Sequence, residues 1–362
     1  MKIHGKPRTS IWTNEARRSV VIIDQTLLPF ALEEHEIMSI EQACDAIRAM
    51  RVRGAPLIGV TAAYGIALQM KTDCTDGALQ AACRALLATR PTAVNLSWAL
   101  KRMERVLSPL DELERADAAW QEAGLMARED IATNTAIGRH GLELIRALHT
   151  KHSRTINILT HCNAGALAAV DWGTATAPIY MAHDAKLPVH VWVEETRPRN
   201  QGLLTAWELR EHGVPHTYIV DNAGGHFMQH GKVDMVIVGV DRASRLGDIA
   251  NKIGTYQKAL AAHDNDIPFY AATPSSSIDW QLDHALAEIE IEERNGDEIR
   301  HLRGLSQDGL TRDFRILDDA SPVANPGFDV TPARLITGII TERGIAAPDQ
   351  LATLFPDESR RS

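Results

Sequence analysis

Cysteine, long apolar runs and excess positive charge are all scarce or missing in this chain of 362 residues. Its four cysteines form no Cys-x-x-Cys pair and accompany no histidine cluster at zinc spacing, so the sequence predicts neither a metal centre nor a disulfide framework. No stretch approaches the roughly 20 apolar residues of a membrane-spanning helix, and the N-terminus lacks the apolar core of a signal peptide. These absences favour a cytoplasmic protein with reduced thiols and no membrane segment.

Acidic residues outnumber basic ones, which restricts the ligands that the protein can bind. Aspartate and glutamate total 47 against 38 for lysine and arginine, so the net charge is −9. This balance argues against an extended nucleic-acid-binding surface but leaves room for a local anion site. Apolar residues make up 44% of the chain, enough for a sizeable core, and the length predicts two domains.

The first 150 residues and the rest of the chain differ in hydrophobic pattern. Residues 9–30 are predicted to be extended, with a β-branched run at Ser19–Thr26 that Pro29 closes. From about residue 38 apolar residues recur at helical spacing, with Ser39 as the expected first helix start and further helical stretches at 78–89, 94–107 and 116–149. The sequence thus predicts a smaller, mainly helical N-terminal domain, with its extended segment, over residues 1–150.

Beyond residue 150 short runs rich in Val, Ile and Tyr alternate with helical stretches. The predicted strands are Ile156–Thr160, Val189–Val193, His216–Val220, Asp234–Val240 and Ile267–Ala272, and the predicted helices between them include Ala164–Ala175, Leu204–His212 and Ile253–Asp264. This alternation is typical of right-handed βαβ units. Residues 151–362 are therefore predicted to form a Rossmann-like, doubly wound α/β domain with a parallel sheet, with a peripheral tail from Ala346.

Two reactive side chains follow predicted strands, where an open α/β sheet places its active site. Cys162 comes directly after the strand at 156–160, and the small residues behind it are expected to start a helix whose dipole would favour the thiolate. Asp241 follows an apolar strand, so partial burial is expected to raise its pKa into a range useful for acid–base chemistry. The alternatives are a small buried thiol at Cys162, and a helix cap or a partner of Arg242 at Asp241.

Three further segments have the composition of an anion site. Gly247–Thr255 places Asn251 and Lys252 at an expected helix start, where main-chain donors and a lysine can hold phosphate, although the Walker A spacing is absent. Arg53 stands before Gly-Ala-Pro at 54–56, which interrupts a helical pattern, and Arg90 stands before Pro91 and Thr92. Each segment taken alone is equally consistent with a cap or a loop.

Two other polar stretches have a plainer interpretation. Residues 194–202, which begin with Glu194 and include Arg199, are interpreted as a solvated loop with internal ion pairs. Residues 221–226, Asp-Asn-Ala-Gly-Gly-His, have the composition of a turn.

Together these segments resemble the 5-methylthioribose-1-phosphate isomerase family, whose superfamily includes regulatory subunits of the translation-initiation factor 2B exchange complex. The resemblance covers nearly the whole chain. Its diagnostic motifs, in chain order, are Arg-Gly-Ala-Pro at 53–56, His-Cys-Asn-Ala-Gly at 161–165, Glu-Thr-Arg-Pro at 195–198, Asp-Asn at 221–222, Gly-Asp through Gly-Thr at 247–255 and Pro-Gly-Phe-Asp-Val-Thr-Pro at 326–332.

The resemblance implies an aldose–ketose isomerisation of a sugar phosphate, carried out by a homodimer without metal or cofactor. Cys162 matches the family cysteine beside the reacting carbon, and Asp241 matches the proposed acid. The positions that match substrate- and phosphate-binding residues are Arg53, Gly54, Ala55, Arg90, Gln201, Asn251 and Lys252. The expected reaction converts 5-methylthioribose 1-phosphate to 5-methylthioribulose 1-phosphate in methionine salvage, by acid-assisted ring opening and transfer of hydrogen from C2 to C1.

Two rival functions stay open at this point. Departures from the family pattern, such as Val240 and the residues 243–246, leave the Cys162–Asp241 pair intact but make 5-deoxyribose 1-phosphate a rival substrate, because one methylthio group in an apolar pocket is worth only a few kcal/mol. A non-catalytic regulatory subunit is the other rival, and it would not need a thiol and a carboxylate together. Removal of the C2 proton by Cys162 and direct hydride transfer from C2 to C1 are both compatible with the sequence.

Overall fold

The N-terminal part of the chain begins with short antiparallel strands. The computed structural model describes residues 1–90 and 94–358. Strands β1 (Lys2–Ile3) and β2 (Lys6–Pro7) form a small pair, and β3 (Ile11–Asn14), β4 (Ser19–Ile23) and β5 (Glu34–Ile37) form a three-stranded sheet in that order. The predicted extended segment is confirmed, and its apolar run is the buried central strand β4.

Five helices follow and build the first core. They are α1 (Ile40–Arg48), α2 (Ala55–Thr72), α3 (Asp76–Leu87), α4 (Val94–Leu107) and α5 (Glu112–His152). Ser39 caps α1 by accepting a hydrogen bond from the main-chain N–H of Gln42, as its sequence position predicts. Helix α2 is apolar around most of its circumference because α1, α3, α4 and α5 surround it.

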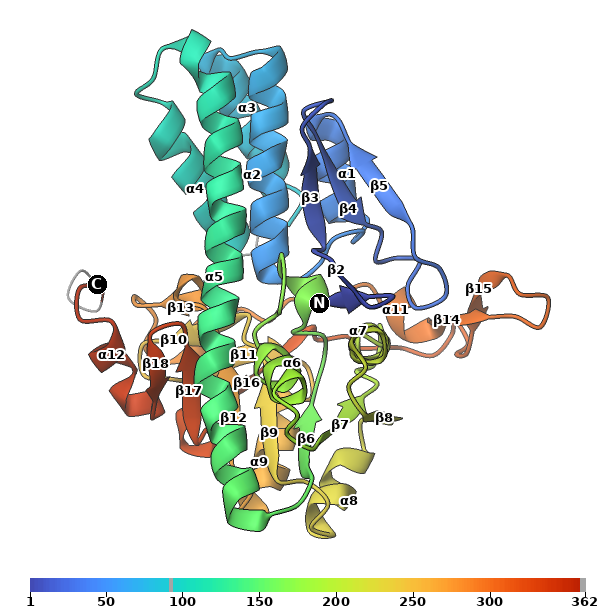
Figure 1. Cartoon of the computed structure of the whole chain (residues 1–362). Helices are drawn as coiled ribbons and strands as arrows, with labels where there is room; N and C mark the ends of the chain where they lie inside the picture. Colours follow the sequence, from blue (N-terminus) through green and yellow to red (C-terminus); the bar gives the residue numbers. More distant parts are fainter. Residues whose placement is uncertain (91–93, 359–362) are drawn as a thin grey trace.

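The C-terminal part is organised around a seven-stranded sheet (Figure 1). Its strands are β6 (Ile156–Thr160), β7 (Val189–Glu194), β8 (His216–Ile219), β9 (Met235–Val238), β12 (Phe269–Ala272), β17 (Gly338–Thr341) and β18 (Gly344–Ala346), arranged in the order β18-β17-β12-β9-β6-β7-β8. All neighbouring pairs are parallel except β17 with β18. Numbered along the chain, the parallel strands have the Rossmann order 3-2-1-4-5-6, so the predicted fold class is confirmed.

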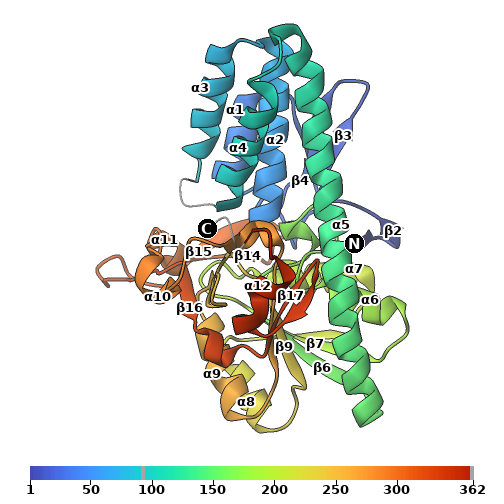
Figure 2. The same ribbon diagram turned by 90° about the vertical axis from the view of Figure 1, so that its left-hand side faces the viewer.

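Helices cover both faces of this sheet, each over its own apolar core. The helices of this part are α6 (Ala177–Asp184), α7 (Gly202–His212), α8 (Ala223–Gln229) and α9 (Thr255–Asp264), with the short α10 (Ala285–Glu288), α11 (Asp297–Arg300) and α12 (Leu351–Leu354). Figure 2 shows α5 and α6 on one side of the sheet and α8 and α9 on the other. Ile137 and Ile179 belong to the first of these cores, and Met228 and Ala259 to the second.

A second, smaller sheet lies beyond the carboxyl ends of the parallel strands, and the sequence analysis missed it. It consists of β13 (Ile278–Asp279), β10 (Arg242–Ser244), β11 (Ile249–Lys252) and β16 (Phe328–Thr331) in that order. A hairpin of β14 (His301–Leu305) and β15 (Thr311–Arg315) projects from the same region (Figure 1). These strands have two to five residues each, too few to show a period.

Helix α5 belongs to both parts of the molecule. Its 41 residues correspond to about 60 Å, at about 1.5 Å per residue, and it packs against α2 at one end and α6 at the other (Figure 1). Gly138 and Gly141 make the contact with α6 possible. A Cβ at Gly138 would lie 2.7 Å from Met181 Cε, and a Cβ at Gly141 would lie 2.4 Å from Pro178 Cγ. A domain boundary near residue 150 stays a prediction.

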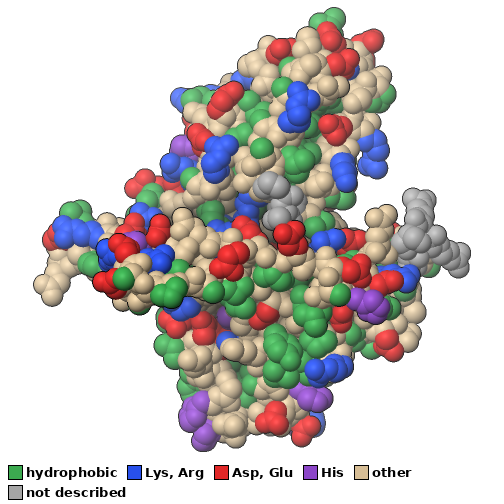
Figure 3. All heavy atoms as spheres, turned by 180° about the vertical axis from the view of Figure 1, so that it is seen from behind, with side chains coloured by type: hydrophobic (Ala, Val, Ile, Leu, Met, Phe, Trp, Pro, Cys, Tyr) green, Lys and Arg blue, Asp and Glu red, His purple; other side chains and the backbone are tan. Residues whose placement is uncertain are grey.

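The surface is of mixed charge. Figure 3 shows acidic and basic side chains interspersed on one face, with apolar side chains between them. In the parts of the chain that the structure describes, no helix combines the length and the apolar character that crossing a bilayer requires.

Candidate active site

Cys162 and Asp241 follow two strands that are neighbours in the sheet although 79 residues separate them in the chain (241 − 162). Cys162 follows β6 and Asp241 follows β9, the first and fourth parallel strands, between which the chain reverses its winding direction. Doubly wound sheets bind their ligands at this switch point. Both side chains line a cavity of about 110 Å³.

The structure brings every sequence-predicted site residue to this one cavity. Its lining includes Cys162, Asp241, Arg53, Gly54, Ala55, Arg90, Gln201, Asn251 and Lys252. Pro91 and Thr92, which accompany Arg90 in the sequence pattern, lie outside the described residues.

The turn at Cys162 is not the start of a helix, so the expected dipole argument is wrong. Cys162 has a left-handed backbone with φ of +65°, and its N–H donates to Thr196 Oγ1 at 2.8 Å. Within the predicted helix at 164–175 only a 3₁₀ turn at 166–168 forms. Positive φ values of +66° at Trp172 and +71° at Gly173 interrupt the backbone inside this range. Glu208 holds the resulting loop by accepting the N–H groups of Ala166 and Leu167, at 2.7 and 3.2 Å.

Asp241 is placed as the sequence predicts, and both alternatives for it are wrong. The residue precedes strand β10 rather than a helix, and Arg242 pairs with Asp279 at 2.5 Å. Burial raises the pKa of Asp241, while Arg90, Lys252 and Arg53 act against this rise. The carboxyl group is therefore a candidate proton donor, in a cavity that keeps cations close to it.

A buried network holds Arg53 beside Cys162. The Arg53 guanidinium donates to Asn163 Oδ1 at 2.6 Å and to Asn163 O at 3.3 Å, and its Nη2 lies 3.9 Å from Cys162 Sγ. Asn163 in turn donates to Glu208 at 2.7 Å, and the Tyr180 hydroxyl donates to the same carboxylate at 2.8 Å. The sequence analysis missed the support that Asn163 and Glu208 give to Arg53, because only the fold brings Glu208 on α7 to Asn163.

Gly54 is required by the close approach of another main chain. It caps α2 with φ of +88°, and a Cβ there would lie 2.3 Å from the main-chain oxygen of Ala168. Pro56 stands in the first turn of α2, where its missing N–H costs no hydrogen bond. The apparent interruption of the helical pattern is thus the start of a helix at the cavity.

Cations form one wall of the cavity. Arg90 has a pKa lowered by burial and by Arg294, and its Nη2 lies 3.8 Å from Glu292 Oε2. Lys252 is 5% exposed, and burial also lowers its pKa. Arg294 lines the same cavity but was missed, because the segment 289–296 has neither helical nor strand periodicity. With Arg53, these side chains give the cavity the charge of an anion site.

Gln201 and Asn251 contribute amides to the cavity. Gln201 precedes α7 and is 8% exposed, and within the described part of the chain its Oε1 has no hydrogen-bond partner. Asn251 lies on β11 and donates to Thr255 Oγ1 at 3.0 Å. The free oxygen of Gln201 suits a hydroxyl group of a bound sugar.

The predicted phosphate cradle at the start of α9 is wrong in one respect. Asp329 accepts the N–H groups of Gly254 and Tyr256, at 2.7 and 3.1 Å, so main-chain donors of this helix end are already used. Lys252 reaches the cavity from strand β11 instead. This segment can therefore bind an anion through the charge of Lys252 rather than through the main-chain N–H groups at the start of α9.

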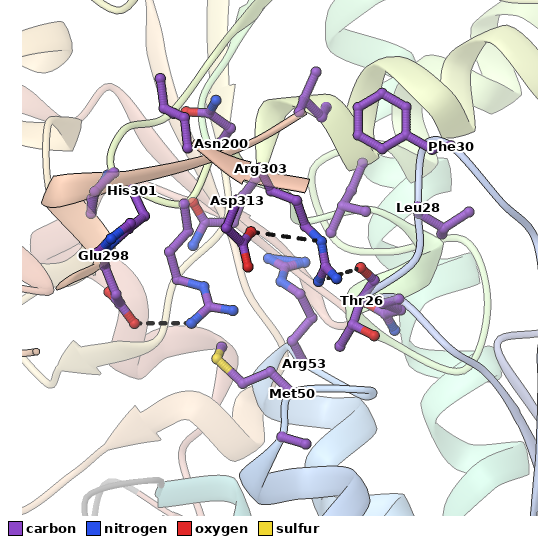
Figure 4. Close-up of a pocket in the computed structure, with 18 of the residues that line it drawn as sticks. Thr26, Leu28, Phe30, Met50, Arg53, Asn200, Glu298, His301, Arg303 and Asp313 are labelled. Atoms are coloured by element: carbon purple, nitrogen blue, oxygen red, sulfur yellow. Dashed lines mark hydrogen bonds and ion pairs between the residues drawn. The ribbon is translucent and has the colours of Figure 1, made fainter. Parts of the chain in front are cut away.

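A wider cavity of about 600 Å³ adjoins the first and shares Met50, Arg53, Arg199 and Gln201 with it. Figure 4 shows Arg53 directed into this space, with Arg303 and Asp313 of the hairpin and Thr26 of the N-terminal part around it. Arg303 donates to Thr26 O at 3.2 Å. The wider cavity thus extends the site from Arg53 and Gln201 toward the hairpin.

The loop at 194–202 is only partly as predicted. Arg199 is exposed and pairs with Glu298 at 2.9 Å. Burial raises the pKa of Glu298, but Arg294 and Arg199 outweigh it and hold the value at about 2. Glu194 is not solvated: it is 0% exposed and lies 2.8 Å from His161 Nδ1. The stretch 221–226 ends in helix α8, and Gly224 makes room for Glu194, since a Cβ would lie 2.2 Å from Glu194 Oε1.

Known proteins share the length and the fold of this chain. Residues 51–348 match the model of the initiation factor 2 subunit family. A methylthioribose-1-phosphate isomerase of Rhodospirillum centenum is 59% identical over 100% of this chain and 98% of its own length. One from Acidiphilium cryptum is 61% identical over 99% of both chains. The chain belongs to the methylthioribose-1-phosphate isomerase family.

Solved structures divide between this isomerase family and initiation factors. The 5-methylthioribose 1-phosphate isomerase of Pyrococcus horikoshii OT3 superposes with a TM-score of 0.84 at 39% identity, over 97% of this chain and 96% of that one. The translation initiation factor eIF-2B, subunit delta, from A. fulgidus gives 0.80 at 36% identity, over 96% and 99%. The shared fold thus accompanies two kinds of protein, and the residues of the cavity must distinguish them.

Proposed function

We propose that this protein converts 5-methylthioribose 1-phosphate to 5-methylthioribulose 1-phosphate, as a step of methionine salvage. The observation that carries this proposal is the single cavity that Cys162, Asp241 and the cationic side chains line together. The names of its full-length relatives support the same substrate. We further propose that the protein acts as a homodimer in the cytoplasm.

Asp241 is proposed to open the sugar ring. The substrate is a glycosyl phosphate, so its ring cannot open to a free aldehyde while the phosphate stays attached. Protonation of the ring oxygen by Asp241 breaks the bond from that oxygen to C1, which leaves a hydroxyl group on C4 and an oxocarbenium ion at C1 that the phosphate oxygen stabilises. Burial raises the pKa of Asp241 and so favours the protonated acid that this step needs.

Hydrogen then moves from C2 to C1. In one route Cys162, as thiolate, takes the C2 proton and an enediol phosphate forms. The thiol then gives a proton to C1, and the C2 hydroxyl proton passes to the Asp241 carboxylate. In the other route C2 passes a hydride to C1 and its hydroxyl proton leaves to a base. In both routes C2 is oxidised and C1 is reduced within one molecule, so the balance needs no external oxidant or reductant.

The cations are proposed to hold the phosphate. A phosphate dianion suits the planar fork of Arg53 and the point charge of Lys252, with Arg90 and Arg294 on the same wall. Because these side chains are largely buried, their charge is little screened by solvent salt. The phosphate would thereby fix C1 next to the thiol and the carboxyl group.

Two rivals remain as outcomes of one experiment. Purified protein would be incubated with the 1-phosphates of 5-methylthioribose, 5-deoxyribose and ribose, and the ketose phosphate detected by NMR. Preference for 5-deoxyribose 1-phosphate would make that sugar the substrate of this protein, while no turnover of any of the three sugar phosphates would favour a non-catalytic subunit. Cys162→Ala and Asp241→Asn should each abolish turnover, whereas Cys74→Ala, a partly exposed thiol elsewhere, should not.

The same assay in D₂O distinguishes the two hydrogen-transfer routes. The enediol route exchanges the migrating hydrogen with solvent and places deuterium on C1, and the hydride route does not. Full activity of both the Cys162 and the Asp241 variant would refute the proposed function.

A further inference from the structure

The ring of His161 joins three segments behind the cavity. Its Nδ1 lies 2.8 Å from Oε2 of Glu194 at the end of β7, and its Nε2 lies 2.8 Å from the main-chain oxygen of Ile253, between β11 and α9. The side chain is 1% exposed. Because a carbonyl oxygen can only accept, Nε2 carries a hydrogen and donates it.

This bridge connects the two loops that carry reactive groups. His161 immediately precedes Cys162, and Ile253 immediately follows Lys252. The loop is shaped to meet the ring: Gly254 has φ of +103°, and a Cβ there would lie 3.1 Å from Cε1 and Nε2 of His161. The imidazole therefore links the loop that carries Cys162 to the loop that follows Lys252.

Charged groups on four elements surround this ring. Glu194 Oε2 lies 3.5 Å from Lys258 Nζ on α9, and Asp221 Oδ1, after β8, lies 3.9 Å from His161 Nδ1. Asp329 on β16 is close enough for the charges of His161 and Lys258 to lower its pKa, although burial, the larger effect, raises it. Glu194 Oε2 therefore lies between the imidazole of His161 and the ammonium group of Lys258.

The same side chains could be considered as metal ligands, since donor atoms of His161, Glu194 and Asp221 lie within 4.8 Å of one another. Both ring nitrogens of His161 and Oε2 of Glu194 already have partners, and among the described residues only Oε1 of Glu194 in this cluster has none. The two oxygens of Asp221 accept the N–H groups of Thr196 and Arg197, at 2.7 and 2.8 Å. Lys258 supplies the positive charge that a metal ion would otherwise supply.

We propose that His161, oriented by Glu194, is a positioning residue that holds Cys162 and Lys252 at the separation that the isomerisation needs. This inference rests on the proposed function for its kinetic readout only. It does not require the imidazole to touch the substrate. It requires both ring nitrogens to keep their hydrogen bonds at once.

Two substitutions separate the two hydrogen bonds. The side-chain amide nitrogen of asparagine takes about the position of Nδ1, so His161→Asn keeps the contact with Glu194 and loses the one with Ile253. The side-chain amide nitrogen of glutamine takes about the position of Nε2, so His161→Gln keeps the contact with Ile253. The matched control is His140→Asn, a part-buried histidine on α5 whose ring lies 2.9 Å from the main-chain oxygen of Thr341.

Each variant would be tested for kcat and KM, for its urea midpoint, and for the rate at which iodoacetamide alkylates Cys162 with and without inorganic phosphate. Mass spectrometry would separate Cys162 from Cys74. We expect His161→Asn to lower kcat by at least about 100-fold, which corresponds to about 2.7 kcal/mol, and to abolish phosphate protection of Cys162. His161→Gln should retain protection and more of kcat.

Three results would overturn the inference. One is kcat of His161→Asn within threefold of the unmodified enzyme. Another is an equal loss of kcat in the two His161 variants that merely follows their loss of stability, as it does in the His140 control. That result would indicate a purely structural residue. The third is a stoichiometric metal ion in the purified protein that His161→Asn removes. If the unmodified protein turns over no sugar phosphate, the proposed function fails, and alkylation with and without phosphate still tests the bridge.

Discussion

Replacement of Arg53 by lysine tests whether the cavity depends on a forked cation or on positive charge alone. Arg53 is 9% exposed, and its guanidinium donates twice to Asn163 and lies within 3.9 Å of Cys162 Sγ. Lysine keeps the charge, but its single nitrogen cannot hold Asn163 and a phosphate at the same geometry. Arg53→Lys is therefore expected to lose at least one charge-assisted hydrogen bond.

The expected size follows from the value of such a bond. A hydrogen bond to a charged group contributes about 1.5–3 kcal/mol, which corresponds to a loss of about 10- to 150-fold in kcat/KM. Steady-state kinetics with the aldose phosphate would measure this, and urea unfolding would show whether the fold is retained.

The matched control is Arg115→Lys in the N-terminal core. Arg115 is 3% exposed, and its guanidinium donates to the main-chain oxygens of Leu107 and Cys74. This variant should lower the free energy of unfolding without lowering kcat/KM. A kcat/KM of Arg53→Lys within threefold of the original, or an equal loss in Arg115→Lys, would refute the reasoning.

Gly54→Ala should lower the unfolding free energy by more than about 2 kcal/mol, from its left-handed backbone and the contact with Ala168, whereas Gly77→Ala, where a Cβ meets no described atom within 4 Å, should be neutral or stabilising in the same urea titration. Asp130 should make the free energy of unfolding depend on pH, because burial raises its pKa from 3.8 to about 7. Its contribution to stability is complete below about pH 4 and is lost as the pH rises through 7. Asp130→Asn should therefore flatten the fall of unfolding free energy between about pH 4 and pH 7; parallel curves for both proteins would contradict this.

The parts of the fold with a clear hydrophobic period could be predicted from the sequence. Helix α4 and strand β6 have the predicted bounds, Val94–Leu107 and Ile156–Thr160. Cys162 and Asp241 were found because a reactive side chain directly after a buried strand is a local signal. That they share one cavity follows from strand order, which places β6 beside β9.

The features that the sequence analysis predicted wrongly or missed depend on contacts between residues that are distant in the chain. The loop that replaces the helix expected at 164–175 is held by Glu208, 42 residues beyond Ala166. Glu194 stands in a polar stretch typical of an exposed loop, and only the fold buries it beside His161 and Lys258. Arg294 gives no signal, because it reaches the cavity from a segment without periodicity.

Helix α5 makes the two parts of the chain interdependent during folding and unfolding. Ala119, Ala123 and Met126 complete the N-terminal core, while Ile137 and Ile145 of the same helix complete one core of the parallel sheet. Unwinding one end exposes apolar surface at that end and removes the support of the other, so the two cores are coupled through a single hydrogen-bonded rod. A chain divided near residue 150 would leave the parallel sheet without part of its cover, and neither piece is expected to be stable alone.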